Sequence, residues 1–235
     1  MRHLSITFIL IFITCLSPAQ ETKKIEIPVY GNDTSYHYKE TIKLLPPLKL
    51  HDLQRTTDSF HLRLWSYNQV VSVWITNDHL INGTITSFAE RYKEALLKKG
   101  KQEVDKVFFK TKKLPAATVQ NIFQSIKNLQ IESILSDNKI TGWQQGLDGE
   151  EYLIEIATQT SYAFRTYWSP RVFADSLPEA KRLQTFINYL FTDLELGNYR
   201  FNLKLPKGVY RTNGVPGINI PASGTKNAGT IYDHL

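Results

Sequence analysis

The alternation of apolar and polar residues near residue 60 restricts the fold of this chain more than any other feature. Phe60, Leu62 and Leu64 occupy every second position, and a run of β-branched and aromatic residues follows at 70–75 after the short stretch 66–68. A period of two places alternate side chains on opposite faces of a β-strand. The two runs therefore predict a hairpin with one apolar face.

Other segments repeat the strand pattern less regularly. Further strands are expected around residues 83–92, 107–111, 139–144, 151–157 and 162–168. Residues 87–99 fit either a strand or a helix, because Phe88, Tyr92 and Leu96 also recur at helical spacing. No internal repeat of about 20–50 residues is present, which argues against a solenoid.

Two later segments change to the helical period. One helix face directly after Pro115 carries Val119, Ile122, Phe123 and Ile126 at i, i+3, i+4 and i+7. A second helix is expected to begin near Pro178, with a buried stripe made of Leu183, Phe186, Ile187, Leu190, Phe191 and Leu194. Strands, a helix, more strands and a final helix predict an α+β fold, in which two helices pack on one face of an antiparallel β-sheet.

The two ends of the chain differ from this central part. Residues 1–19 match a secretory signal peptide, with Arg2 before an apolar run too short to span a bilayer and small residues at 17–19. Cys15, the only cysteine, offers a lipid anchor as a second interpretation. We expect an extended N-terminal arm at 20–58, an α+β domain at 59–205 and a flexible tail at 206–235, which is rich in Gly, Pro and Asn.

Composition limits the chemistry that the mature chain can perform. Without cysteine it forms no disulfide, thiol nucleophile or cysteine-ligated zinc site. The net charge of +6, or about +5 without Arg2, favours anionic surfaces but defines no partner. P-loop, G-x-G-x-x-G, G-x-S-x-G and H-E-x-x-H patterns do not occur. We therefore expect a secreted or periplasmic protein of the bacterial envelope, with no cofactor, no metal and no transmembrane segment in the mature chain.

The stretch GWQQGLDGEEYLIEI at 142–156 combines glycines with carboxylates. Asp148-Gly149 predicts a two-residue hairpin turn, whose central residues need positive φ. The calcium-loop pattern fails beyond these two residues, so we expect a turn and not a site. A three-residue or a five-residue loop after the following strand places Glu155 and Arg165 on one face, where they are expected to form a pair.

This stretch and the next strand also resemble a known pattern. G-L-D-G at 146–149, Tyr152, Glu155 and W-S-P at 168–170 are similar to a signature of uncharacterised secreted and lipoprotein-like bacterial proteins. The similarity covers residues 59–195 in element order, and the family often carries an arginine where Tyr167 stands here. The resemblance implies the fold and a location outside the cytoplasm, and it implies no activity.

Lysines and tryptophans form the remaining candidate features. The lysines around residues 93–113 either grip an anionic polymer or protect an edge strand from aggregation, and no specific nucleic-acid signal accompanies them. His61 is expected on the surface of its strand. Four tryptophans either fill the core or line a groove for carbohydrate or peptide: Trp65, Trp74, Trp143 and Trp168.

These features favour a non-catalytic binding module whose partner is an envelope polymer or another secreted protein. The expected surface is the sheet face that bears Glu155, or alternatively the lysine cluster. The candidate binding residues are Asp148, Glu155, Arg165, Tyr167 and Trp168. The alternative function is a hydrolase of envelope polysaccharide or peptide, in which paired carboxylates come from Asp148, Glu151 and Glu155.

Overall fold

The computed structural model describes residues 23–31, 33–66, 68–146, 148–194, 196, 205–212 and 215–220, with the backbone alone at 212 and 215–220. The expected signal peptide, Cys15 and residues 221–235 lie outside the described residues. Within the described part, five α-helices accompany a large, mostly antiparallel sheet, so the α+β class is confirmed.

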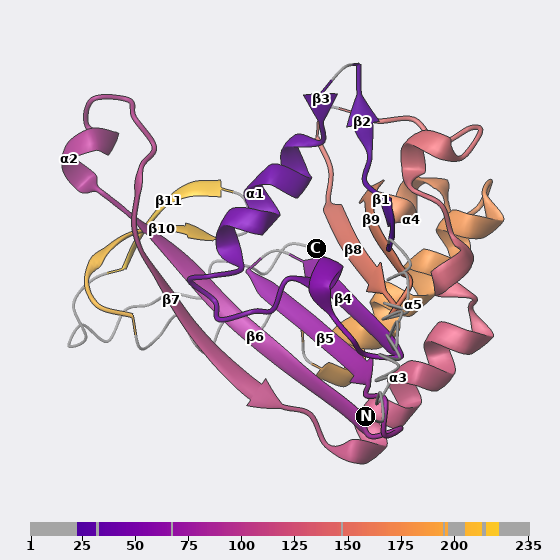
Figure 1. The fold of residues 1–235 in the computed structure, drawn as a ribbon. Coiled ribbons are helices and arrows are strands. Elements are labelled where there is room, and N and C mark those ends of the chain that lie inside the picture. The colour runs from indigo at the N-terminus through magenta and orange to yellow at the C-terminus, as the bar shows by residue number, and fades with distance from the viewer. Residues whose placement is uncertain are drawn as a thin grey trace, which may run out of the picture.

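Nine strands form the main sheet, in the order β1-β9-β8-β4-β5-β6-β10-β11, with β7 paired to the other side of β6 (Figure 1). Neighbouring strands are antiparallel except β1, which runs parallel to β9. The strands are β1 (Lys24–Glu26), β4 (Phe60–Ser66), β5 (Gln69–Ile75), β6 (Ile81–Tyr92), β7 (Val104–Lys113), β8 (Glu151–Ala157), β9 (Ser161–Trp168), β10 (Gly208–Thr212) and β11 (Val215–Ile220). A separate two-stranded sheet contains β2 (Val29–Tyr30) and β3 (Asp33–Thr34).

The first hairpin is present as predicted, whereas part of the chain expected to be a flexible C-terminal tail forms strands. Strands β4 and β5 pair from Phe60 opposite Ile75 to Ser66 opposite Gln69. Residues 208–212 and 215–220 form β10 and β11, and β10 pairs with β6 beyond the end of β5. The expectation of a flexible tail is wrong for these residues, because the long strand β6 offers β10 a ladder partner and β10 in turn pairs with β11.

Strands β6 and β7 form a long hairpin that reaches away from the rest of the sheet, with α2 (Glu94–Leu97) at its tip (Figure 1). The ambiguous residues 87–99 are therefore strand as far as Tyr92 and helix only at the tip. The helical spacing of Phe88, Tyr92 and Leu96 is coincidental, because the first two residues belong to a strand and the third to a short helix.

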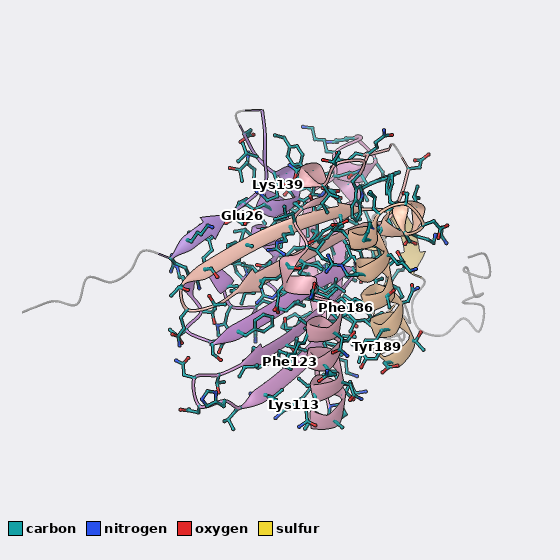
Figure 2. The ribbon with its side chains drawn as sticks, turned by 90° about the vertical axis from the view of Figure 1, so that its right-hand side faces the viewer. Glu26, Lys113, Phe123, Lys139, Phe186 and Tyr189 are labelled. Atoms are coloured by element: carbon teal, nitrogen blue, oxygen red, sulfur yellow. The ribbon has the colours of Figure 1, made fainter. Side chains whose placement is uncertain are left out.

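The main core joins the sheet to α3 (Ala116–Asn128) and α5 (Pro178–Leu194). Leu62 and Leu64 of the hairpin lie in one buried cluster with Ile122 of α3 and Phe186 of α5. The ring of Phe123 meets Phe60 edge-on, with centroids 5.8 Å apart; Figure 2 shows Phe123 and Phe186 on their helices. The predicted apolar faces of the hairpin and of both helices thus meet.

A second core lies on the other side of the same strands, which the sequence pattern did not predict. Residues 36–44 form α1 (Tyr36–Leu44), followed by a turn and a 3₁₀ helix, η1 (Leu53–Arg55). Leu45 and Leu48 pack with Trp65, Val70 and Phe88, which lie on the sheet face opposite to that of Leu64. The expected extended arm at 20–58 is therefore wrong in part: it contains a helix, and the helices are not limited to two on one face.

The strand expected at 139–144 is also wrong. Residues 137–139 form the 3₁₀ helix η3 (Asp137–Lys139), which follows η2 (Ile131–Ser133) and packs on β9. The Thr166 amide donates to Ser136 Oγ at 3.0 Å, and the Trp168 amide donates to Asp137 Oδ2 at 2.8 Å. Side chains thus replace a ladder strand here, and the Lys139–Glu26 ion pair at 2.5 Å joins η3 to β1 (Figure 2).

We expect Gly83→Ala to lower the free energy of unfolding by about 1–3 kcal/mol, because the added carbon overpacks the core. A Cβ at Gly83 would lie 2.7 Å from Val119 Cγ2 of α3 and 3.2 Å from Val73 Cγ1. Denaturant unfolding measures the change, with Asn82→Ala, on the other face of β6, as the control. Equal stability of Gly83→Ala and the parent chain would contradict this close approach of α3 and β6.

Candidate functional site

Glu155 lies in a buried polar cluster and not on an open sheet face. Its side chain is 0% exposed. Oε2 accepts hydrogen bonds from Arg63 Nη1 at 3.1 Å and from Trp65 Nε1 at 2.7 Å, and Oε1 accepts one from the Tyr162 hydroxyl at 3.0 Å. Burial is the main cause that raises the pKa of Tyr162, which therefore stays a donor. No ligand reaches Glu155 in this arrangement, because α1 and η1 cover the face.

The predicted Glu155–Arg165 pair is wrong, because the hairpin loop has an even number of residues. Thr158 and Ser161 close the turn around residues 159 and 160, and Thr158 Oγ1 accepts the Ser161 amide at 3.1 Å. In this register Glu155 stands opposite Phe164, and Arg165 stands opposite Ile154. A change of one residue in a register moves a side chain to the other face.

Arg165 and Tyr167 are buried residues that hold the segment after α3. Arg165 Nη1 donates to the Glu132 carbonyl at 2.8 Å, and the Tyr167 hydroxyl donates to the Ile134 carbonyl at 2.9 Å. Burial also raises the pKa of Tyr167. These contacts satisfy backbone groups at the end of a helix, so the two residues do not form an accessible binding surface.

The Asp148-Gly149 segment is not the predicted hairpin turn. Neither residue has positive φ, and Asp148 is exposed. A Cβ on Gly149 would lie 2.6 Å from Trp168 Nε1, and one on Gly146 would lie 2.5 Å from the same indole. The glycines are therefore required where the chain crosses the Trp168 ring closely, and not where it reverses direction.

Trp168 belongs to an open groove, here called the α1 groove, between the N-terminal segment and the start of β8. It has a volume of about 620 Å³. Tyr30 and Tyr36 line it together with Trp168, and Tyr36 is 64% exposed. His37 Nδ1 lies 3.0 Å from Glu151 Oε2 within this lining.

A smaller pocket of about 310 Å³, here called the glutamate pocket, adjoins the α1 groove and shares Tyr36, His37 and Glu151 with it. Burial raises the pKa of Glu90, and the Arg211 guanidinium, at 3.7 Å, opposes this rise. Its other acidic lining residues are Glu40, Glu150 and Glu151.

Glu151 and Glu155, two of the carboxylates proposed from the sequence for a hydrolase, do not form a pair. Glu151 and Glu155 are four residues apart in β8, which corresponds to about 13 Å along a strand. The carboxyl groups of glycosidases lie about 5–9.5 Å apart. Glu155 is buried, and Asp148 is exposed on the preceding segment.

A further cleft, here called the sheet-face cleft, has a volume of about 890 Å³ and lies between residues 48–58 and strands β4 to β7. His61 lines it and is only 7% exposed, so the expectation of a surface histidine is wrong. His61 Nδ1 lies 2.9 Å from Asp58 Oδ2, and the imidazole stacks on Trp74 with centroids 5.3 Å apart. Alternation predicted which face His61 occupies, but not that residues 48–58 would cover it.

The lysine cluster follows β7 and the tip of its hairpin. Lys93 and Arg91 form ion pairs with Glu103 and Asp105 across the hairpin. Lys106 lies 5.1 Å from the centroid of the Phe108 ring. Lys98, Lys99, Lys101, Lys110, Lys112 and Lys113 are exposed.

The tryptophans divide between core and clefts. Trp65 and Trp143 are buried, whereas Trp74 and Trp168 are half-buried and line the sheet-face cleft and the α1 groove. Among the described residues, no three His, Cys, Asp or Glu side chains are grouped so that they could hold a metal ion. In the same part of the chain, no helix is long and apolar enough to cross a membrane.

Comparison with known proteins adds no assignment to these sites. The chain matches no protein-family model and no curated protein.

Proposed function

We propose that this protein is a secreted or periplasmic, non-catalytic binding module that holds a neutral saccharide chain in the α1 groove. The observation that carries the proposal is an open groove in which Tyr30, Tyr36 and Trp168 are set among polar side chains. Aromatic rings offer flat apolar faces to the C–H faces of sugars, and polar side chains beside them bind hydroxyl groups.

The charges in the α1 groove support a neutral ligand. Lys39 Nζ lies 2.6 Å from Asp33 Oδ1, and His37 lies 3.0 Å from Glu151. Lys39 and Asp33 thus neutralise each other, and Glu151 is the remaining formal charge of the lining, so the groove presents little net charge to a polymer. An anionic polymer fits the lysines of β7 better than this groove.

The scaffold favours binding at this place. We infer that α3 and α5 back one face of the sheet, while the α1 groove opens on the other. Glu151, at the start of β8, pairs with Trp168, at the end of β9, and the buried Glu155 cluster lies on the same face. Rigid strands position a binding surface more accurately than loops do.

We expect Tyr36→Ala to weaken polysaccharide binding about tenfold, because an exposed aromatic contact contributes about 0.5–1.5 kcal/mol beyond its buried area. Affinity electrophoresis in gels containing neutral β-glucan, mannan or xylan measures binding. Val172→Ala removes an equally exposed apolar side chain, 64% exposed in each case, outside the groove and serves as the control. Unretarded migration in all three gels, or equal retardation of Tyr36→Ala, would reject the proposal.

Hydrolysis of the same polysaccharide is the second candidate function. It is favoured by one observation, the raised pKa of Glu90 in a pocket that three further glutamates line. A protonated carboxyl group beside an ionised one is the arrangement that glycoside hydrolysis uses. An assay for reducing ends released from the same polysaccharides separates the two functions. If reducing ends are released and Glu90→Gln abolishes their release, the protein is a hydrolase and not a non-catalytic binding module.

A further inference from the structure

The sheet-face cleft contains a polar atom whose hydrogen-bonding capacity is unused. His61 Nε2 is buried and has no hydrogen-bond partner within the described part of the chain. Buried polar atoms in folded proteins are nearly always paired, so each exception requires an explanation. The cleft shares no lining residue with the α1 groove or the glutamate pocket.

The contacts of His61 decide which kind of partner Nε2 accepts. Asp58 Oδ2 lies 2.9 Å from Nδ1 and also accepts the Thr56 hydroxyl at 2.7 Å. A carboxylate is an acceptor, so Nδ1 carries the ring hydrogen and Nε2 presents a lone pair. Burial lowers the pKa of His61 to about 4, which keeps the ring neutral at pH 7. The missing partner is therefore a hydrogen-bond donor.

Other residues that line the cleft indicate the chemistry of the rest of the ligand. The half-buried Trp74 ring stacks beside His61 at an interplanar angle of 16°. Ser72, Thr84 and Thr111 add hydroxyl groups to the lining. A flat apolar ring beside several hydroxyl groups fits a molecule with one apolar face and many hydroxyl groups.

Three of the five charged residues that line this cleft have a partner of opposite charge, and the other two, Lys49 and Asp58, are opposite in charge to each other. Asp52 Oδ2 lies 3.7 Å from Arg55 Nε, and Arg63 is held by Glu155, by Ser72 Oγ at 3.3 Å and by the His51 carbonyl at 2.9 Å. The cleft therefore carries no strong field that would select an ionic ligand.

We propose that the sheet-face cleft is a second binding site, which takes a sugar ring whose hydroxyl group donates to His61 Nε2 while the ring lies against Trp74. Nε2 is buried in the structure, so binding includes a small displacement of the side chains that cover it. The site is independent of the α1 groove and could bind a second unit of a chain or a separate sugar.

The test uses nuclear magnetic resonance of the full-length protein with labelled histidine and tryptophan. Glucose, galactose, N-acetylglucosamine and glucuronate are titrated separately to millimolar concentrations. We expect at least one of them to shift both the His61 Nε2 resonance and the Trp74 indole resonance with a common, saturable dependence on concentration. If water alone satisfies Nε2, none of the four sugars moves these signals, and the proposal is overturned.

Two variants connect the signal to the site. His61→Phe keeps a ring against Trp74 but removes the acceptor, so the dissociation constant, read from the Trp74 resonance, is expected to rise at least tenfold. Unchanged affinity of His61→Phe for the sugar would overturn the proposal. Tyr36→Ala is expected to leave this titration unchanged. The proposal for the α1 groove and the proposal for the sheet-face cleft can therefore be rejected independently of each other.

Discussion

Replacing Arg63 with methionine is expected to lower the free energy of unfolding by about 3–5 kcal/mol, the largest effect of any single change considered. Arg63 is 1% exposed and lies 3.1 Å from Glu155, which is completely buried. Methionine fills part of the space but leaves the carboxylate without its cation. Trp65 and Tyr162 still donate to it, and two neutral donors do not replace a positive charge in a low dielectric.

Denaturant unfolding of three variants separates this effect from lost packing. Arg63→Met alone leaves a buried charge, whereas Arg63→Met with Glu155→Met removes both charges and is expected to recover most of the loss, as apolar replacements of buried pairs do. Arg55→Met is the control, because its side chain is 87% exposed and its pair with Asp52 contributes about 0–1 kcal/mol. If Arg63→Met loses no more stability than Arg55→Met, Arg63 does not stabilise the folded state by compensating the buried charge of Glu155.

Lowering the pH from about 6.5 to about 4 is expected to remove roughly 3 kcal/mol of stability through His61 alone, at 1.36 kcal/mol per pKa unit. Burial lowers the pKa of folded His61 to about 4, and the unfolded chain takes up the proton near the ordinary value of 6.5. The unfolded state therefore binds more protons between these values, so stability is complete above the upper limit and falls as pH decreases. Asp58 opposes the pKa shift, and Arg63 and His51 add to it.

His61→Phe isolates this contribution from the carboxylates that also titrate below pH 5. The free energy of unfolding of both proteins is measured between pH 4 and pH 8, and the difference between them is expected to change with pH by the stated amount. The His61 resonance should also titrate near pH 4 in the folded protein. A His61 pKa near 6.5 in that titration would contradict the burial and the linkage together.

The elements that could be predicted are those whose signal is local. The alternation of Phe60, Leu62 and Leu64 and the helical spacing of Val119 and Ile122 predicted strands and a helix, and their apolar faces meet in one core. Period and polarity depend on neighbouring residues in the chain, so they are visible before any tertiary contact is known.

The candidate site was predicted less well, because its residues depend on distant partners. Glu155 was expected to meet Arg165 across a hairpin, but it meets Arg63 of β4, and the even loop turns Arg165 to the other face. Trp168 was the candidate that reached an open groove. Tyr36, which also lines this groove, came from a segment expected to be extended.

The glycines of G-L-D-G show the same limit. Their spacing predicted a turn, since Asp-Gly favours positive φ, yet Gly146 and Gly149 are needed because the Trp168 indole lies against them. A glycine required by local conformation and one required by close approach look identical in the sequence.

The sequence by itself determined the strand and helix periods, one buried face of the first hairpin, and the absence of cysteine from the expected mature chain. Tertiary structure decided the remainder: that α1 and η1 cover the second face, that Arg63, Glu155 and His61 are therefore buried, and which side chains line the clefts. The physical reason is that burial and ion pairing are set by segments far apart in the chain, such as residues 51 and 63, whose meeting no local pattern encodes.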